Sequence, residues 1–191
     1  MSMKITVALC AVAVVIGVQN PAGAGDNSFV GSNKCKLCHS GQHKSWKATK
    51  MANAFDLLKP GSRAEARKKA KLDPDKDYTS DTTCLPCHVT GYGKPGGFKS
   101  IEQTPELAGV GCESCHGAAS AYLAEDKMSN KNKEYKAADL AAAGLTKPTK
   151  QTCLQCHNNK SPFVGKDYVF DFEKRKAQGT HEHKPLKYNH E

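Results

Sequence analysis

The chain has 191 residues, nine cysteines and a formal net charge of +9, while only 38% of its residues are hydrophobic and 7% are aromatic. A mean hydropathy of −0.60 predicts a thin core of side chains, because a domain of this size ordinarily buries a large apolar area. Of the 28 basic residues 25 are lysine, which argues against nucleic acid as a partner, since sequence readout favours bidentate arginine.

Residues 1–24 have the features of a secretory signal peptide. A positive start precedes an apolar stretch at residues 5–18, and residues 22–24 form a small-residue cleavage site. A permanent membrane anchor fits less well, because the apolar stretch is shorter than the roughly 18 residues of a membrane span. We therefore expect an exported, periplasmic protein without a stable membrane anchor, whose mature part is residues 25–191.

The eight cysteines of the mature part form four Cys-x-x-Cys pairs, and a histidine follows each pair directly. Two thiols three positions apart on one helical turn can reach both vinyl groups of a porphyrin, and the adjacent imidazole can bind the iron. Zinc sites or disulfides would not require a histidine after every pair. The sequence therefore predicts four covalently attached c-type haems. The attachment residues are Cys35 and Cys38, Cys84 and Cys87, Cys112 and Cys115, and Cys153 and Cys156, and the proximal iron ligands are His39, His88, His116 and His157.

Between the motifs the sequence predicts short helices and long loops with little or no β-sheet. A capping box at Ser62–Glu65 indicates one helix start, and Gly144 indicates one helix end. No linker divides the mature chain, so we expect one mainly α domain wrapped around the haems. The predicted elements are helices at residues 36–58, 62–72, 118–125, 134–143 and 171–183, and a short strand at residues 168–170.

Each iron has a second axial position, and six side chains compete for these four positions. His43 lies on the same helical face as His39, so it either reaches a neighbouring haem or is a solvated surface histidine. Met51 has helical spacing with Phe55 and Leu58, so core packing is the alternative to ligation. Only one of the two histidines at 181 and 183 is expected to bind iron. The six candidates are His43, His181, His183, His190, Met51 and Met128.

The flanking stretches resemble the tetrahaem c-554 type cytochromes of ammonia-oxidising bacteria. The resemblance is carried by Trp46 with Thr49 and by residues 71–79, 91–97, 109–117 and 181–183. It implies a mainly helical fold with haems in closely stacked pairs. It also implies three haems with two histidine ligands, an open high-spin haem at the second motif, and hydroxylamine oxidoreductase as the electron donor.

The same resemblance implies a role for particular residues at the distal positions. His181 corresponds to the ligand of the haem held by His116. Met51 stands where the family has the histidine of the fourth haem, and we expect this methionine to replace it. Asp126 stands where the family has the ligand of the first haem, with Met128 two residues later. For the first haem the alternatives are ligation by Met128, ligation by His43, a local rearrangement, or an open haem.

These observations predict an electron carrier, not an enzyme, that accepts electrons from one redox protein and delivers them to another. One alternative is a reductase of a small nitrogen oxide, such as NO, at an open haem on His88. A second is a subunit of a polymeric outer-surface cytochrome. A lysine cluster around the first motif predicts docking of an acidic partner, although an ordinary solvated helix face has the same composition. Its members are Lys34, Lys36, Lys44, Lys47 and Lys50.

Overall fold

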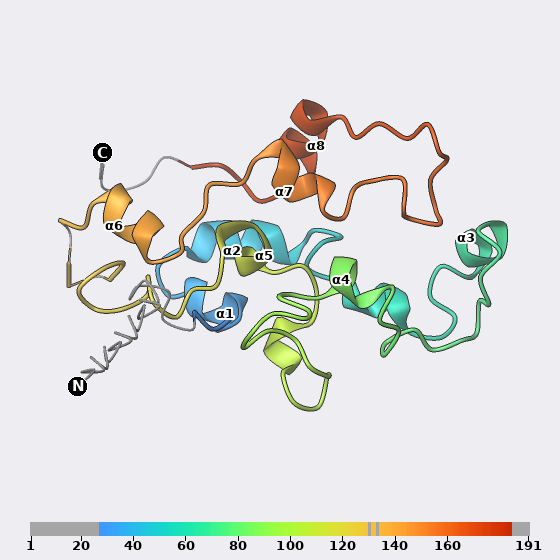
Figure 1. Ribbon diagram of the computed structural model, residues 1–191, viewed down its shortest axis with the longest axis horizontal. Helices are drawn as coiled ribbons and strands as arrows, with labels where there is room; N and C mark the ends of the chain where they lie inside the picture. Colours follow the sequence, from blue (N-terminus) through green and yellow to red (C-terminus); the bar gives the residue numbers. More distant parts are fainter. Residues whose placement is uncertain (1–26, 130, 133, 185–191) are drawn as a thin grey trace, which may run out of the picture.

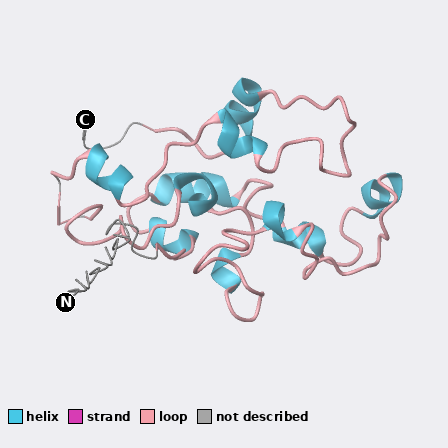
Figure 2. Ribbon diagram, viewed as in Figure 1, coloured by secondary structure: helices cyan, strands magenta, loops and turns pink. Residues whose placement is uncertain are grey.

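The computed structural model describes residues 27–129, 131–132 and 134–184, and the predicted signal peptide lies outside these ranges. The protein is built from short helices joined by long loops (Figures 1 and 2). Helix α1 spans Ser32–Cys35, α2 Ser40–Lys47, α3 Ala64–Lys69, α4 Leu85–His88, α5 Cys112–His116, α6 Ala137–Ala142, α7 Lys150–Leu154 and α8 Phe172–Gly179, and the 3₁₀ helices η1 and η2 span Phe55–Leu58 and Pro105–Leu107.

The mainly α prediction is confirmed. Across the described ranges there is no β-strand, and one isolated antiparallel bridge joins Val89 to Ala108. The strand predicted at residues 168–170 is therefore wrong. Helices α1, α2 and α5 lie together in the middle of the molecule, with α3 at one end and α6 at the other (Figure 1). No helix in the described part of the chain is long and apolar enough to cross a membrane.

The single helix predicted over residues 36–58 is wrong, because α2 and η1 are separate elements there. α2 begins after His39, whose backbone is not helical (φ −112°, ψ 46°). Beyond α2, the hydroxyl of Thr49 accepts the N–H of Ala52 at 3.2 Å. Local bonds of this kind compete with the helical hydrogen-bond pattern, and they explain the turn between the two elements.

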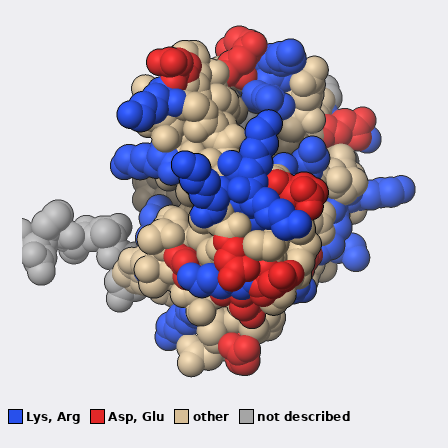
Figure 3. Space-filling model, turned by 90° about the vertical axis from the view of Figure 1, so that its right-hand side faces the viewer, with Lys and Arg blue, Asp and Glu red and all other residues tan. Residues whose placement is uncertain are grey.

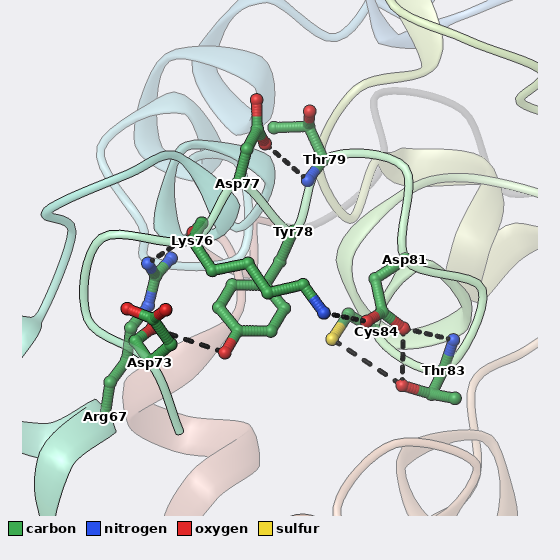
Figure 4. Close-up of polar contacts among 9 residues, drawn as sticks. All are labelled: Arg67, Asp73, Lys76, Asp77, Tyr78, Thr79, Asp81, Thr83 and Cys84. Carbon is green, nitrogen blue, oxygen red and sulfur yellow. Dashed lines mark hydrogen bonds and ion pairs between the residues drawn. The ribbon is translucent and has the colours of Figure 1, made fainter.

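The capping box predicted at Ser62–Glu65 is not formed. α3 begins instead at Ala64, after Arg63, which has a left-handed backbone (φ 53°) and makes no side-chain cap. Its inner face carries Arg67, whose buried guanidinium lies 4.8 Å above the ring of Tyr78 (Figure 4). This guanidinium donates to the carbonyl oxygens of Leu57 and Lys59 at 2.8 Å, Pro74 at 2.9 Å and Lys76 at 3.1 Å. Tertiary hydrogen bonds, and not a local cap, therefore hold α3.

The helix predicted over residues 118–125 is also wrong, because its hydrogen bonds do not keep helical spacing. The N–H of Leu123 donates to the carbonyl of Ala119 at 3.0 Å, but that of Ala124 donates to Ala121, only three residues back, and the segment forms turns.

A buried carboxylate precedes these turns. Glu113 accepts the N–H of Ala119 at 2.8 Å and those of Val30 and Gly31 at 3.0 and 2.8 Å. The same carboxylate ties the beginning of the described chain to the third motif.

The other two predicted helices are confirmed, although both are shorter than expected. Helix α6 lies within residues 134–143 and is followed by Gly144 at φ 98°. Helix α8 begins after Asp171, whose side chain accepts the N–H of Lys174 at 3.1 Å. It ends at Gly179, so His181 lies beyond the helix and not on it.

Two small clusters of buried side chains make up the core, as the composition predicts. The first cluster lies under η1 and α4, and the second lies between the third motif and α6. The first consists of Phe55, Leu58, Tyr78, Leu85, Val89, Phe98 and Leu107. The second consists of Ala119, Tyr122, Leu140 and Ala143, with Val30, Ala121, Leu123, Met128, Tyr135 and Leu145 packed against it.

Replacing the buried carboxylate tests this account of the fold. Glu113→Gln keeps the size of the side chain but leaves one oxygen to accept hydrogen bonds and removes the charge that strengthens them. We expect the free energy of unfolding to fall by about 2 kcal/mol, measured by denaturant titration of the holoprotein. The exposed Glu173→Gln on α8 is the control, and equal stability of the two variants would contradict the anchoring role.

Candidate haem-attachment sites

The backbone of each motif places the histidine one helical turn after the first cysteine. The N–H of His39 donates to the carbonyl of Cys35 at 2.9 Å, and the fourth motif repeats this bond between His157 and Cys153 at 2.9 Å. In the second and third motifs, α4 and α5 each extend to the histidine. Both thiols and the imidazole of each motif thus share one turn, as two thioethers and a proximal ligand require.

Thiols from different motifs lie near one another. The thiols of the first and third motifs are close enough to shift each other's pKa, as are those of the second and fourth, and the third and fourth interact electrostatically. The pairs are Cys35 with Cys112, Cys87 with Cys156, and Cys115 with Cys153. The motifs therefore form a spatial series in the order first, third, fourth and second, which is not their order in the chain.

Two of the predicted proximal histidines are oriented by backbone carbonyls. The Nδ1 atom of His88 lies 2.6 Å from the oxygen of Ala54, and Nδ1 of His116 lies 3.2 Å from that of Thr146. A carbonyl oxygen only accepts, so Nδ1 carries the proton and Nε2 keeps its lone pair for a metal. No sequence motif marks these two acceptors, which sequence reasoning therefore missed.

Glycines allow the acceptor loops to approach the motifs. Gly109 has φ 84°, and a Cβ on it would collide with the carbonyl oxygen of Ala52. Gly117 follows the third motif at φ 81°, and a Cβ there would collide with the oxygen of Gly144. Only glycine tolerates both the backbone conformation and the close approach. The loops that carry the carbonyls of residues 54 and 146 can therefore lie against the proximal histidines.

The donor set fits four covalently attached haems. Burial lowers the pKa of all four imidazoles, which favours the neutral form that binds iron. The ring of His157 also stacks on Phe170, with centroids 4.6 Å apart. Within the described residues no three His, Cys, Asp or Glu side chains converge as a zinc site would require. The lowered pKa values are those of His39, His88, His116 and His157.

His181 stands opposite the proximal histidine of the third motif. The ring centroids of His116 and His181 are 6.3 Å apart, with planes inclined by 31°. Metal–imidazole bonds are about 2 Å long, so two imidazoles on opposite sides of one metal ion have centroids about 6 Å apart. Nδ1 of His181 lies 2.9 Å from the carbonyl of Glu182, which leaves its Nε2 free. By contrast, Nε2 of His183 lies 3.0 Å from the hydroxyl of Thr180.

Ligation and core packing both stay predictions for Met51. This half-buried residue belongs to neither described hydrophobic cluster, although Phe55 and Leu58 belong to the first. Its carbonyl accepts the N–H of Val110 at 2.9 Å, which fixes its backbone beside the third motif. Its side chain remains available for another contact.

The other distal candidates differ in accessibility. Asp126 has 75% of its side chain exposed and pairs with Lys127 at 3.2 Å, whereas Met128 packs against the second cluster. Nε2 of His43 is buried without a hydrogen-bond partner in the described part of the chain. His190 lies outside the described residues.

Comparison with known proteins shows that the chain is similar to cytochromes. A family model described as cytochrome c554 and c-prime matches residues 34–117. The chain is 37% identical over 208 residues to cytochrome c-554 of Nitrosomonas europaea, with 96% of this chain and 88% of that protein covered. The solved reduced state of cytochrome c554 from that organism gives a TM-score of 0.73 at 37% identity, covering 85% of this chain and 89% of that one.

Substitution at position 181 tests the facing pair of imidazoles. In His181→Ala we expect one ferric haem per molecule to change from low spin to high spin, because its sixth ligand is lost. The measurement is electron paramagnetic resonance of the purified protein. His183→Ala is the matched control and should leave every spin state unchanged. The same change in both variants, or in neither, would contradict the assignment.

Proposed function

The chain belongs to the cytochrome c554 family, and we propose that it passes electrons between two redox proteins along motifs arranged in the order first, third, fourth and second. As a member of this family it is a multihaem c-type cytochrome with four c-type haems, and its function is electron transfer and not enzymatic turnover. Bound haem supplies a one-electron redox centre at each motif.

The 6.3 Å separation of His116 and His181 is the observation that carries this proposal. An iron saturated by two imidazoles changes valence with little ligand rearrangement, as an electron carrier requires. The cysteines and histidines of the four motifs hold the haems in this proposal, and residues 25–191 act as one domain around them. Family membership does not favour the alternatives of a nitrogen-oxide reductase at the haem of His88 or a polymeric cytochrome subunit.

An electron-transfer cytochrome has redox proteins as partners, and two features support a finer assignment. The features of a signal peptide in residues 1–24 support export to the periplasm. The resemblance of the flanking stretches supports a hydroxylamine oxidoreductase-like donor. The acceptor in this scheme is a second redox protein.

Met51 is the proposed distal ligand of the haem held by His157. It follows α2 in a turn whose Ala54 carbonyl contacts His88, and Cys87 of that motif contacts Cys156 of the fourth. This turn therefore lies beside the second and fourth motifs. The half-buried thioether belongs to neither cluster in the described part of the chain and is free to turn towards the fourth motif.

Exchanging this sulfur for an imidazole tests the assignment. In Met51→His we expect the reduction potential of one haem to fall while all spin states are retained, because imidazole stabilises the ferric state more than a thioether does. Redox titration followed by optical spectroscopy measures the change. Leu57→His on the adjacent η1 helix is the control, and a potential unchanged in Met51→His would exclude ligation.

The docking surface proposed for an acidic partner is the lysine patch at the first motif, formed by Lys34, Lys36, Lys44, Lys47 and Lys50. All five lysines are exposed, and no ion pair found in the described ranges involves them. Leu37 lies among them with 80% of its surface exposed and supplies an apolar centre.

The end of the molecule that carries α3 has a different charge pattern. On the face that carries α3, basic and acidic side chains lie next to one another (Figure 3). Two ion pairs of this region are Lys59 with Asp56 at 2.6 Å and Lys68 with Glu65 at 3.1 Å. Neutralised charges attract a partner less than unpaired ones do. The lysine patch is therefore favoured as the docking surface.

Charge reversal at the lysine patch tests the docking proposal. In a Lys44→Glu, Lys47→Glu double variant we expect the rate of electron transfer from reduced flavodoxin, an acidic redox protein, to fall about tenfold at low ionic strength. Stopped-flow spectroscopy measures the rate, and added salt should diminish the difference. Lys68→Glu, Lys69→Glu on α3 is the matched control. Equal losses in the two double variants would exclude a specific patch.

A further inference from the structure

We propose that Met128 supplies the second axial ligand of the iron held by His39. This inference rests on the proposed four-haem carrier and assigns a metal ligand where the chain lacks the family's histidine. It predicts that the first haem has one imidazole and one thioether ligand, unlike the third haem with its facing pair of imidazoles.

The second hydrophobic cluster lies against the first motif. Tyr122 of this cluster interacts electrostatically with Cys35, and Tyr135 interacts with Cys38. Val30, two residues before α1, also packs against this cluster, so the cluster lies beside the first motif. A side chain from this cluster can reach the porphyrin that these cysteines would hold.

Met128 is the member of this cluster best suited to bind iron. Its backbone N–H donates to the carbonyl of Tyr122 at 3.1 Å, which fixes it next to the residue that contacts the first motif. Its thioether is half-buried and packs inward. A thioether is an established axial ligand of c-type haem, and it needs no proton release to bind.

The competing ligands of the first haem are less suitably placed or less suited to bind iron. The carboxylate of Asp126 points to solvent and pairs with Lys127, and Nε2 of His43 is covered by protein. The hydroxyl of Tyr122 donates to the carbonyl of Gly117 at 3.1 Å. Burial also raises the pKa of this phenol, so it stays protonated and is a weak iron ligand.

A Met128 ligand would influence which haem of the molecule retains an electron. A thioether ligand raises the potential of a haem above that of one with two imidazoles. The first haem would then retain an electron in preference to the neighbouring third haem. Because the lysine patch surrounds the first motif, the retained electron would stand next to the proposed docking surface.

The experiment removes one sulfur at a time from the holoprotein. In a Met51→Ala background, the methionine-to-ferric-iron absorption band in the far red should persist, and adding Met128→Ala should abolish it and convert one further haem to high spin. Adding Met128→His in place of alanine should abolish the band while that haem remains low spin. Asp126→Ala is the matched control and should change neither signal.

The outcomes separate this inference from the proposed function. A band and spin states unchanged by Met128→Ala would overturn the ligand while four reducible haems left the carrier function intact. If Met128→Ala does not fold, the test relies on Met128→His alone. Persistence of the methionine-to-ferric-iron band in that variant would overturn the inference. A wild-type protein that binds fewer than four haems would instead contradict the proposed carrier.

Discussion

Close approach of the four Cys-x-x-Cys-His motifs is the constraint on which the rest of this structure depends. The motifs come from distant parts of the chain, yet the N–H of Cys112 donates to Ser32 in α1 at 3.0 Å, and Sγ of Cys156 lies 3.9 Å from the carbonyl of Pro86 in the second motif. A chain with so few buried apolar side chains cannot achieve this through helix packing alone, and its helices are accordingly one or two turns long. Buried polar side chains supplement the apolar packing, because Glu113 and Arg67 each form hydrogen bonds with backbone groups of separate segments.

The sequence was sufficient to predict what depends on local spacing. The four motifs, the mainly α class and the positions of α6 and α8 follow from residue patterns a few positions long. The predicted helix at residues 118–125 failed because the helical bond from Leu123 to Ala119 is followed by a shorter-range bond from Ala124 to Ala121, a change that no periodicity reveals. The predicted cap of α3 failed because Arg63 takes a left-handed backbone, and Arg67 instead anchors the helix through carbonyls of residues before and after it.

The orientation of the imidazoles likewise depends on groups that are distant in sequence, although the positions of the histidines follow from the motifs. The motif specifies where His88 and His116 lie in the chain, but the acceptors for their Nδ1 atoms are backbone carbonyls of Ala54 and Thr146. Backbone acceptors carry no side-chain signature. The indirect signal is glycine, because Gly117, directly after His116, permits a close approach of the loop at Gly144 that any Cβ would prevent, and this loop carries Thr146. A glycine next to an attachment motif is thus informative about the carbonyl that orients the proximal histidine.

The two positions that the family resemblance assigns to distal histidines, 51 and 126, have different surroundings in this structure. At position 51 the hydrogen bond to Val110 fixes the backbone, so a methionine can replace a histidine from the same place in the fold. At position 126 the side chain is directed to solvent, and exchange at that position alone could not restore a ligand. A replacement must come from a residue with a different orientation, and Met128 has it because it packs into the cluster that faces the first motif. In the proposed assignments the axial ligands change while the attachment motifs stay constant, which would adjust the potentials on an unchanged scaffold.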